Sequence, residues 1–308
     1  MSGGWISASG SGDADGDDVG LDCCRFSGCG SERWSHGNSP GCFTEGRVSN
    51  PVSGLLSRVL NRGFRRYVRR FVRSNFNAVR VVGHESLQQI GERSLVVYVN
   101  HPGWWDPMAA VLLTDMLLSP RQFAAPMDAA ALSRYPILER LGFFGVPREP
   151  ISGAREFLRN ARAVLQDSQT ALWITPTGHF HDVRQPLPFQ PGLAHLVDRK
   201  FGGLVLPMAL EYPFWNERRP ELLVAFGAVV DCTLLADDRE ERNGQLEAGL
   251  QAVQERLRLL AIERDPAAFE TLLDGRAGVG GWYDLWRRLT FWRRGQKFAG
   301  RHEEREHD

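Results

Sequence analysis

The chain has 308 residues, of which 43% are hydrophobic, enough for one large domain with appendages or for two small ones. Basic and acidic residues balance at 37 each, so the overall charge gives no reason to expect a nucleic-acid partner. No run approaches the ~20 apolar residues of a transmembrane helix, and the N-terminus lacks a signal-peptide pattern. We therefore expect a globular, cytoplasmic protein.

Residues 1–50 are rich in Gly and Ser and have no apolar period, so we expect a disordered tail. Whether this tail belongs to the native protein is left open by the sequence. Four of the five cysteines lie in it, namely Cys23, Cys24, Cys29 and Cys42. Their spacing matches no regular pair of zinc ligands, so we expect reduced thiols and no metal site.

Residues 51–80 are interpreted as a basic amphipathic helix. Apolar residues recur at helical spacing from Leu55 to Asn75, and seven of the residues from 58 to 73 are Arg. This pattern is typical of a helix in a membrane interface, where anionic headgroups attract each basic residue by about 1 kcal/mol. The alternative is a surface helix of the domain with solvated arginines.

Residues 81–235 are expected to form the core of the protein. Strands and helices alternate there, which predicts an α/β fold with a mostly parallel central sheet flanked by helices. The expected strands are 79–82, 96–99, 121–127, 143–146, 171–175, 204–211 and 221–230. The expected helices are one starting at Pro107 and those at 129–141, 152–167 and 193–198. Pro207, inside a strand, indicates an edge position or a bulge.

Residues 236–308 are expected to form C-terminal helices and a tail. The stretch 246–264 is a charged amphipathic helix that should pack on the sheet. In GWYDLWRRLTFWRRGQKF, residues 281–298, tryptophans alternate with arginines. That composition favours the headgroup layer of a membrane, although tryptophans covering the core would give the same pattern.

A Pro-Gly loop after the strand 96–99 holds His101 and Asp106. The carboxyl end of a central strand is where catalytic groups collect in open α/β sheets. A histidine beside a carboxylate is the minimal equipment for activating a hydroxyl, because the imidazole takes the proton and the carboxylate orients it. Alternatively, Asp106 caps the following helix and His101 is a packed loop residue.

The sequence Asn100-His101, followed by Asp106, resembles the signature block of the glycerolipid acyltransferase superfamily, the PlsC-like lysophospholipid acyltransferases. Three further blocks extend the resemblance over roughly residues 81–230. They are GFFGVPRE with Gly142, Phe144 and Arg148, ITPTGHF with Pro176 and Gly178, and LVLPMAL with Pro207. The third block departs from the family pattern, because Thr177 stands in place of Glu and Phe180 in place of Arg.

The resemblance implies a glycerol-3-phosphate acyltransferase-like fold and a role in lipid metabolism such as phospholipid biosynthesis. It implies transfer of a fatty acyl group from acyl-CoA or acyl carrier protein to a lipid hydroxyl. On that analogy His101 is the general base and Asp106 orients it, without a covalent enzyme intermediate, a metal or a further cofactor. We expect the protein to act on anionic membrane lipids, peripherally on the inner face of the cell membrane.

Substrate contacts are expected from six residues of these blocks: Trp104, Trp105, Arg148, Thr177, Gly178 and Arg184. Trp104 and Trp105 would line the acyl groove, unless they are packed core residues. Arg148 is the matched phosphate ligand, whereas Thr177 cannot replace a charged group. The acceptor is therefore either a lysophosphatidate-type glycerolipid or a neutral glycolipid, with Arg184 as a possible substitute contact.

Two other functions are weighed. A metal hydrolase would use His179, His181, His195 and Asp182, but their spacing does not match a zinc-binding helix. A non-catalytic membrane-surface protein on a degenerate acyltransferase fold would explain the altered third block. The presence of both His101 and Asp106 argues against the second alternative.

Overall fold

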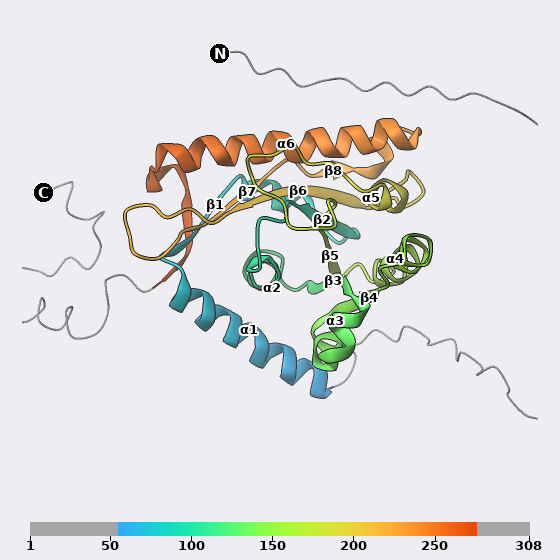
Figure 1. The fold of residues 1–308 in the computed structure, drawn as a ribbon, viewed down its shortest axis with the longest axis horizontal. Coiled ribbons are helices and arrows are strands. Elements are labelled where there is room, and N and C mark those ends of the chain that lie inside the picture. The colour runs from blue at the N-terminus through green and yellow to red at the C-terminus, as the bar shows by residue number, and fades with distance from the viewer. Residues whose placement is uncertain (1–54, 276–308) are drawn as a thin grey trace, which may run out of the picture. The chain divides into compact units, whose positions relative to one another are not determined.

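The computed structural model describes residues 55–275, so the expectations for residues 1–50 and 281–298 lie outside it. The described strands form one nine-stranded sheet in the order β4-β3-β5-β2-β6-β7-β1-β9, with β8 paired to β6 (Figure 1). The strands are β1 Ala78–Val82, β2 Leu95–Val99, β3 Gln122–Asp128, β4 Phe143–Val146, β5 Thr170–Ile174, β6 Leu204–Glu211, β7 Leu222–Phe226, β8 Val230–Asp231 and β9 Glu270–Asp274.

The strands from β4 to β6 in this order are all parallel to their neighbours. β7 runs antiparallel to β6 and parallel to β1, and β9 closes the far edge antiparallel to β1. The fold is thus α/β with a mostly parallel central sheet flanked by helices, as the alternation of elements predicts. β9 lies beyond residue 235, where we expected the core to end, and it belongs to the same sheet.

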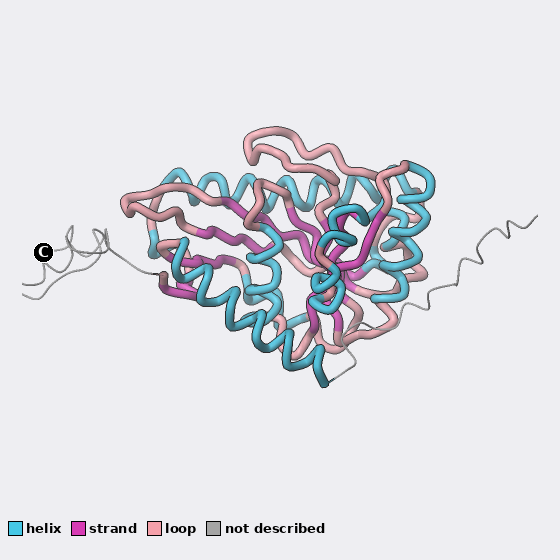
Figure 2. Tube along the Cα trace, turned by 60° about the horizontal axis from the view of Figure 1, so that its bottom comes forward, coloured by secondary structure: helices cyan, strands magenta, loops and turns pink. Residues whose placement is uncertain are grey.

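Helices cover both faces of the sheet (Figures 1 and 2). The α-helices are α1 Leu55–Asn75, α2 Asp106–Leu117, α3 Ala129–Arg134, α4 Pro150–Val164, α5 Gly192–Leu196 and α6 Arg239–Glu263. Short 3-10 helices lie at η1 His84–Gln89, η2 Pro136–Leu141, η3 Cys232–Leu234 and η4 Pro266–Ala268. None of these described helices is both long enough and apolar enough to cross a bilayer.

The central strand β2 is buried on both faces, as its β-branched run predicts. Its side chains alternate between the two layers because successive residues of a strand point to opposite sides. Val96 and Tyr98 join the cluster under α4, α5 and α6. Leu95, Val97 and Val99 join the cluster that includes residues of α1 and α2. The strand that leads to His101 is therefore fixed from both sides.

The apolar side of α1 packs on the domain itself. Val68 and Val72 are 0% and 1% exposed, and α1 lies against α2 and η2. Most of the arginines of α1 are exposed, together with Val59 and Tyr67. This packing matches the alternative of a surface helix, because the apolar stripe serves the core. A membrane contact by α1 would use its arginines and these two exposed apolar residues.

The expected edge position of Pro207 is wrong, since β6 lies between β2 and β7 inside the sheet. On one side of β6 the neighbour changes from β8, opposite residues 204 and 205, to β7, opposite residues 208 to 211. The carbonyl of Pro207 accepts a hydrogen bond from Gly227 N on this side (2.9 Å). The backbone nitrogen of Pro207, which has no hydrogen, therefore faces the gap between β8 and β7. No hydrogen bond between strands is lost there.

Other differences arise from turn and cap chemistry. The helix expected at 129–141 breaks at Tyr135 (φ −132°, ψ 70°), because a residue before proline disfavours the helical region. The strand expected at 221–230 is split into β7 and β8 at Gly227. The last long helix, expected from residue 246, already begins at Arg239, since the Asp238 side chain accepts a hydrogen bond from Glu241 N (2.9 Å).

Candidate active site

The loop that carries His101 is anchored by Asn100, which directly follows β2. Asn100 is 1% exposed and bonds both backbone groups of Leu210 in β6. Its Nδ2 donates to Leu210 O (2.9 Å), and its Oδ1 accepts from Leu210 N (2.7 Å). The amide side chain thus extends the connection between β2 and β6 by one residue. The backbone position of His101 follows from this contact.

His101 and Asp106 face each other across the loop. Nδ1 of His101 lies 2.5 Å from Oδ2 of Asp106, the first residue of α2. The Asp106 side chain is 4% exposed and that of His101 is 20% exposed. With Nδ1 protonated and bonded to the carboxylate, Nε2 is the acceptor nitrogen of the ring. The pair is arranged so that the histidine can receive a proton from solvent or a ligand.

Two further donors fix the carboxylate of Asp106. Gly103 N donates to Oδ2 (3.2 Å), and the Tyr212 hydroxyl donates to Oδ1 (2.5 Å). Burial raises the pKa of Tyr212 well above its ordinary value, and the neighbouring charge and hydrogen bond of Asp106 add to this effect. The phenol therefore remains a donor throughout the physiological pH range. Sequence reasoning missed Tyr212, whose one signal was its position directly after a core strand.

One aromatic side chain, that of Phe180, lies against the His101 ring, and two tryptophans follow in the same loop as His101. The ring of Phe180 lies 4.4 Å from it, centroid to centroid, and the Phe180 side chain is 58% exposed. Trp104 is 68% exposed and able to contact a ligand, whereas Trp105 packs against Phe71 and Phe76, with 5.4 Å between ring centroids in each case. Of the two tryptophans, Trp105 is the packed one.

The third sequence block lies beside the catalytic loop, because His181 N donates to His101 O (2.8 Å). Thr177 is 0% exposed, and its hydroxyl donates to His179 O within the same turn (2.9 Å). Gly178 has φ +72°, and an added Cβ would meet Gln190 only at 3.6 Å, so the backbone conformation and not crowding favours glycine there. Thr177 and Gly178 thus shape the loop that places Phe180 against His101.

The two arginines expected to bind substrate lie elsewhere. Arg148 follows β4 at the sheet edge, and β3 and β5 separate β4 from β2, which is roughly 14 Å at normal strand spacing. Its guanidinium pairs with Asp128 (2.6 Å) and is 83% exposed. Arg184 pairs with Asp182 through two hydrogen bonds, of 2.8 and 2.7 Å. The structure does not bring Arg148 next to His101.

A polar groove lies between residues 183–187 and α6, with a volume of about 420 Å³. Arg184 and Arg258 line it, and Arg258 makes two hydrogen bonds of 2.7 Å to Glu255. Glu211, the last residue of β6, interacts electrostatically with both arginines, and burial raises its pKa above the ordinary value. Glu211 directly precedes Tyr212, so the two side chains point to opposite sides of the sheet, Glu211 toward these arginines and Tyr212 toward Asp106.

The described residues contain no group of three or more His, Cys, Asp and Glu side chains placed to hold a metal ion. His179 and His181 lie close together, with 5.6 Å between ring centroids. His195 instead lies beside Arg239, with 3.2 Å between His195 Nε2 and Arg239 Nη1. The three histidines named for a metal hydrolase therefore do not form a metal-binding cluster.

The fold is thus an α/β domain in which a buried carboxylate holds the His101 imidazole at the carboxyl end of the central strand β2. The family model described as Acyltransferase matches residues 78–211. This match over residues 78–211 agrees with the resemblance to the PlsC-like acyltransferases that the sequence blocks indicate.

Among solved structures, the chain is similar to the crystal structure of the 1-acyl-sn-glycerophosphate (LPA) acyltransferase PlsC from Thermotoga maritima. The sequence identity is 16% and the TM-score 0.44, and the match covers 65% of this chain and 79% of that chain. No curated protein matches the chain at a significant level.

Proposed function

We propose that the protein transfers a fatty acyl group from a thioester, either acyl-CoA or acyl carrier protein, to a hydroxyl of a lipid acceptor. The observation that carries this proposal is the His101 imidazole, held through Nδ1 by a buried carboxylate while its Nε2 remains the acceptor nitrogen. The acyltransferase family match of residues 78–211 supports the choice of acyl transfer among the reactions that such a pair serves.

In the proposed reaction one proton passes from the acceptor hydroxyl to His101 and then from His101 to the leaving thiolate. The acceptor hydroxyl gives its proton to Nε2 of His101 as its oxygen bonds to the thioester carbonyl carbon. The tetrahedral intermediate collapses by breaking the C–S bond, and the leaving thiolate takes the proton from the imidazolium. Asp106 stabilises the imidazolium that exists between these steps. The route forms no covalent bond to the protein and uses no cofactor besides the acyl donor.

For the acceptor, we propose a headgroup bearing hydroxyls rather than a phosphate. The polar groove is lined by the loop that follows His181, and it carries two arginines. Asp182 and Glu255 pair with these arginines, and Glu211 is a third carboxyl group that interacts with both of them. A phosphate there would face three carboxyl groups, whereas hydroxyls can pair with carboxylates, amides and guanidinium groups alike. A lysophosphatidate-type acceptor, bound through Arg148, is the alternative that the assay must test.

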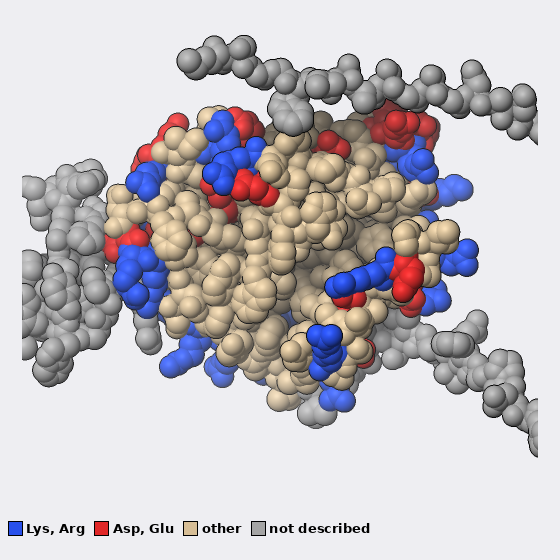
Figure 3. Space-filling model, in the orientation of Figure 1, with Lys and Arg blue, Asp and Glu red and all other residues tan. Residues whose placement is uncertain are grey.

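A membrane-surface location also belongs to the proposal. The face drawn in Figure 3 has few charged residues at its centre, and its arginines, lysines and acidic residues gather along the margin. Trp104, Phe180 and Phe214 are exposed aromatic residues, two of them beside His101. Such side chains suit contact with lipid, and peripheral binding at the inner face of the cell membrane would bring the acceptor to the site.

The test is acyl transfer by the purified protein, with lysophosphatidate and a glycosylated lipid as separate acceptors. We expect turnover of the glycosylated lipid, and His101→Ala should lower it by a factor of at least ~100 with the fold intact. His179→Ala, an exposed histidine in the neighbouring loop, is the matched control and should retain activity.

Unchanged activity of His101→Ala would reject the general base. Preference for lysophosphatidate would reject the neutral acceptor while leaving acyl transfer in place. Absence of transfer to either acceptor, with membrane binding retained, would favour the non-catalytic membrane-surface protein.

A further inference from the structure

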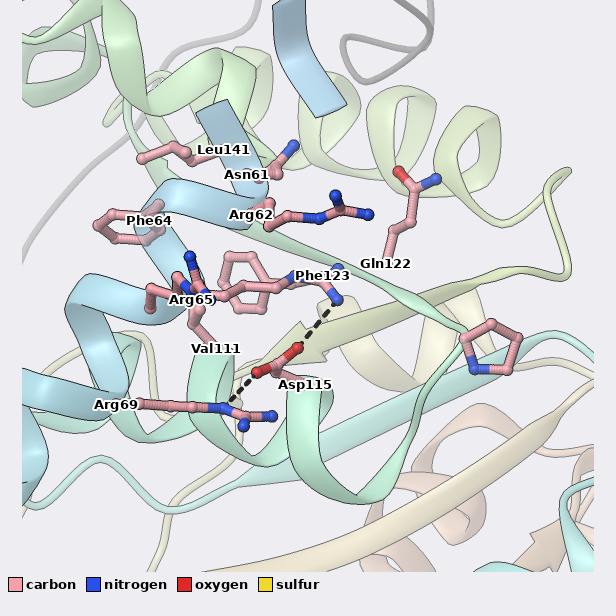
Figure 4. Close-up of a pocket in the computed structure, with 12 residues that line it drawn as sticks. Asn61, Arg62, Phe64, Arg65, Arg69, Val111, Asp115, Gln122, Phe123 and Leu141 are labelled. Carbon is pink, nitrogen blue, oxygen red and sulfur yellow. Dashed lines mark hydrogen bonds and ion pairs between the residues drawn. The ribbon is translucent and has the colours of Figure 1, made fainter. Parts of the chain in front are cut away.

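A second pocket lies at the other end of α2 from the catalytic loop (Figure 4). It has a volume of about 410 Å³ and is bounded by α1, α2, the start of β3 and the end of η2. Asp115, on its wall, follows Asp106 by nine residues of α2, or about 14 Å along the helix axis. The pocket is thus separate from the site around His101.

The pocket is strongly cationic. Arg62, Arg65, Arg66 and Arg69 line it, and Asp115 is its one acidic lining residue. Asp115 accepts from Arg65 Nη1 (3.2 Å) and from Arg69 Nε (2.7 Å), as Figure 4 shows. Arg62 and Arg66 are exposed and form no ion pair with the described residues. The lining therefore carries three more positive than negative charges.

The spacing of these arginines is unfavourable for an isolated helix. Residues 62, 65, 66 and 69 are three or four apart, so they share one side of α1, and like charges at these spacings repel. Asp115 offsets part of this repulsion, but it reaches only Arg65 and Arg69. A bound anion would offset the rest.

The remaining wall of the pocket is largely apolar. Phe64 and Val111 face it from the two helices, and Phe123 and Leu141 from β3 and η2, as Figure 4 shows. Phe123 and Leu141 are 7% and 6% exposed, so this wall is continuous with the core. An inorganic anion would use only the arginines. The combination suits a ligand that joins an anion to an apolar or aromatic body.

We infer that this pocket binds a phosphate group carried on an apolar or aromatic body. Guanidinium groups bind phosphate oxygens through paired hydrogen bonds, and the excess positive charge of the lining favours an anion. Two sources offer this chemistry, the headgroup of an anionic phospholipid and the nucleotide phosphates of coenzyme A. The inference does not depend on the reaction at His101.

The experiment compares two double variants of the full chain. Arg62→Gln with Arg66→Gln removes two charges from the pocket, and Arg70→Gln with Arg73→Gln removes two from the same helix outside it. All four arginines are exposed, so both variants should fold. The probes are coenzyme A, measured by calorimetry, and phosphatidylcholine vesicles with and without phosphatidylglycerol, measured by sedimentation.

The pocket variant should bind its probe roughly tenfold more weakly or worse, whereas the control variant should change by less than about twofold. Selective loss of coenzyme A binding identifies the nucleotide, and selective loss of binding to the anionic vesicles identifies the lipid headgroup. Equal losses of binding in both variants would mean that the charge of α1 attracts the probe in general, and they would overturn the proposed binding in the pocket. An unchanged affinity in both variants would also overturn it. Binding by His101→Ala should equal that of the unchanged protein, which separates this result from the fate of the proposed reaction.

Discussion

Helix α2 carries a carboxylate in its first turn and another in its last, and the two have opposite surroundings. Asp106 is held by the His101 ring, the Tyr212 hydroxyl and a backbone N–H. Asp115 is held by the guanidinium groups of Arg65 and Arg69. The donors at Asp106 are neutral when His101 is neutral, while those at Asp115 are always charged.

On the proposed mechanism, Asp106 is a carboxylate placed for chemistry and Asp115 is one placed for structure. Neutral donors orient Asp106 without cancelling its charge, so the charge can stabilise an imidazolium when His101 takes a proton. The charge of Asp115 is already matched by two cations, and its task is to fix α1 against α2. The same substitution, Asp to Asn, should therefore lower activity at Asp106 and stability at Asp115.

The largest expected effect is that of Asp106→Asn. An amide can bond Nδ1 in its unprotonated form and so favours the wrong tautomer of His101, which should lower kcat by about 10² to 10⁴. Asp115→Asn should leave kcat within about twofold, because it lies far from the proton transfer. The measurement is the initial acyl-transfer rate at saturating donor, with circular dichroism as the check on folding. Comparable losses in the two variants would contradict the distinction.

A smaller effect is expected for Tyr212→Phe, which removes only the hydroxyl that orients Asp106. We expect kcat to fall about tenfold with KM little changed, since a hydrogen bond to a charged group is involved but no substrate contact. Because the pKa of Tyr212 is raised, activity should show no decline from its ionisation as pH rises to about 10. Tyr135→Phe, at an exposed tyrosine, is the control. A change confined to KM would instead place Tyr212 in the substrate site.

Asp115→Asn should act on stability. The ion pairs it removes involve arginine side chains that are 27% and 46% exposed, so the free energy of unfolding should fall by no more than about 1 kcal/mol. Urea unfolding at low and high salt is the measurement, and the loss should shrink at high salt because ions screen partly exposed pairs. A loss that is independent of salt would mean that packing, not charge, holds α1 there.

The smallest expected effect is a pH-dependent difference in stability at Glu211. Burial raises its pKa in the folded protein, although Arg184 and Arg258 act in the opposite direction. The unsubstituted protein should therefore lose stability as pH rises through the pKa of this residue, because the folded state holds the proton more tightly. Glu211→Gln has no titratable carboxyl group, so its Tm relative to that of the original protein should increase as the pH rises above the ordinary pKa of a glutamate. A constant or decreasing difference would show that the arginines outweigh burial.

The parts of the site that sequence predicts are those formed by neighbours in the chain. His101 and Asp106 are five residues apart, between a strand and a helix that the local pattern indicates. Tyr212 is 106 residues from Asp106 and meets it only because β6 pairs with β2. The exposed position of Arg148 likewise follows from β4 being at the sheet edge. The local periodicity of the sequence does not encode the order of the strands. The contact of Tyr212 with Asp106 and the exposure of Arg148 therefore could not be predicted before the fold was known.

The same reason explains the errors in the fold. The strand rich in β-branched residues, β2, was predicted as buried on both faces because composition alone indicates it. Pro207 was assigned to an edge or a bulge, since the change of partner beside it is invisible in the sequence. The helical period of α1 predicts a helix, but the choice between a membrane and α2 as the cover of its apolar side depends on tertiary packing.

The end of β6 places strict limits on changes in chain length. Glu211 and Tyr212 are consecutive, so they point to opposite sides of the sheet, one toward the arginines of α6 and its loop and the other toward Asp106. Insertion of a single residue between 204 and 211 would bring Glu211 to the place of Tyr212 and set two acids against each other beside His101, whereas a deletion would bring Pro213 there. The paired bonds of Asn100 to Leu210 oppose such a slip. Variants with one residue more or fewer should therefore not be tolerated within the strand.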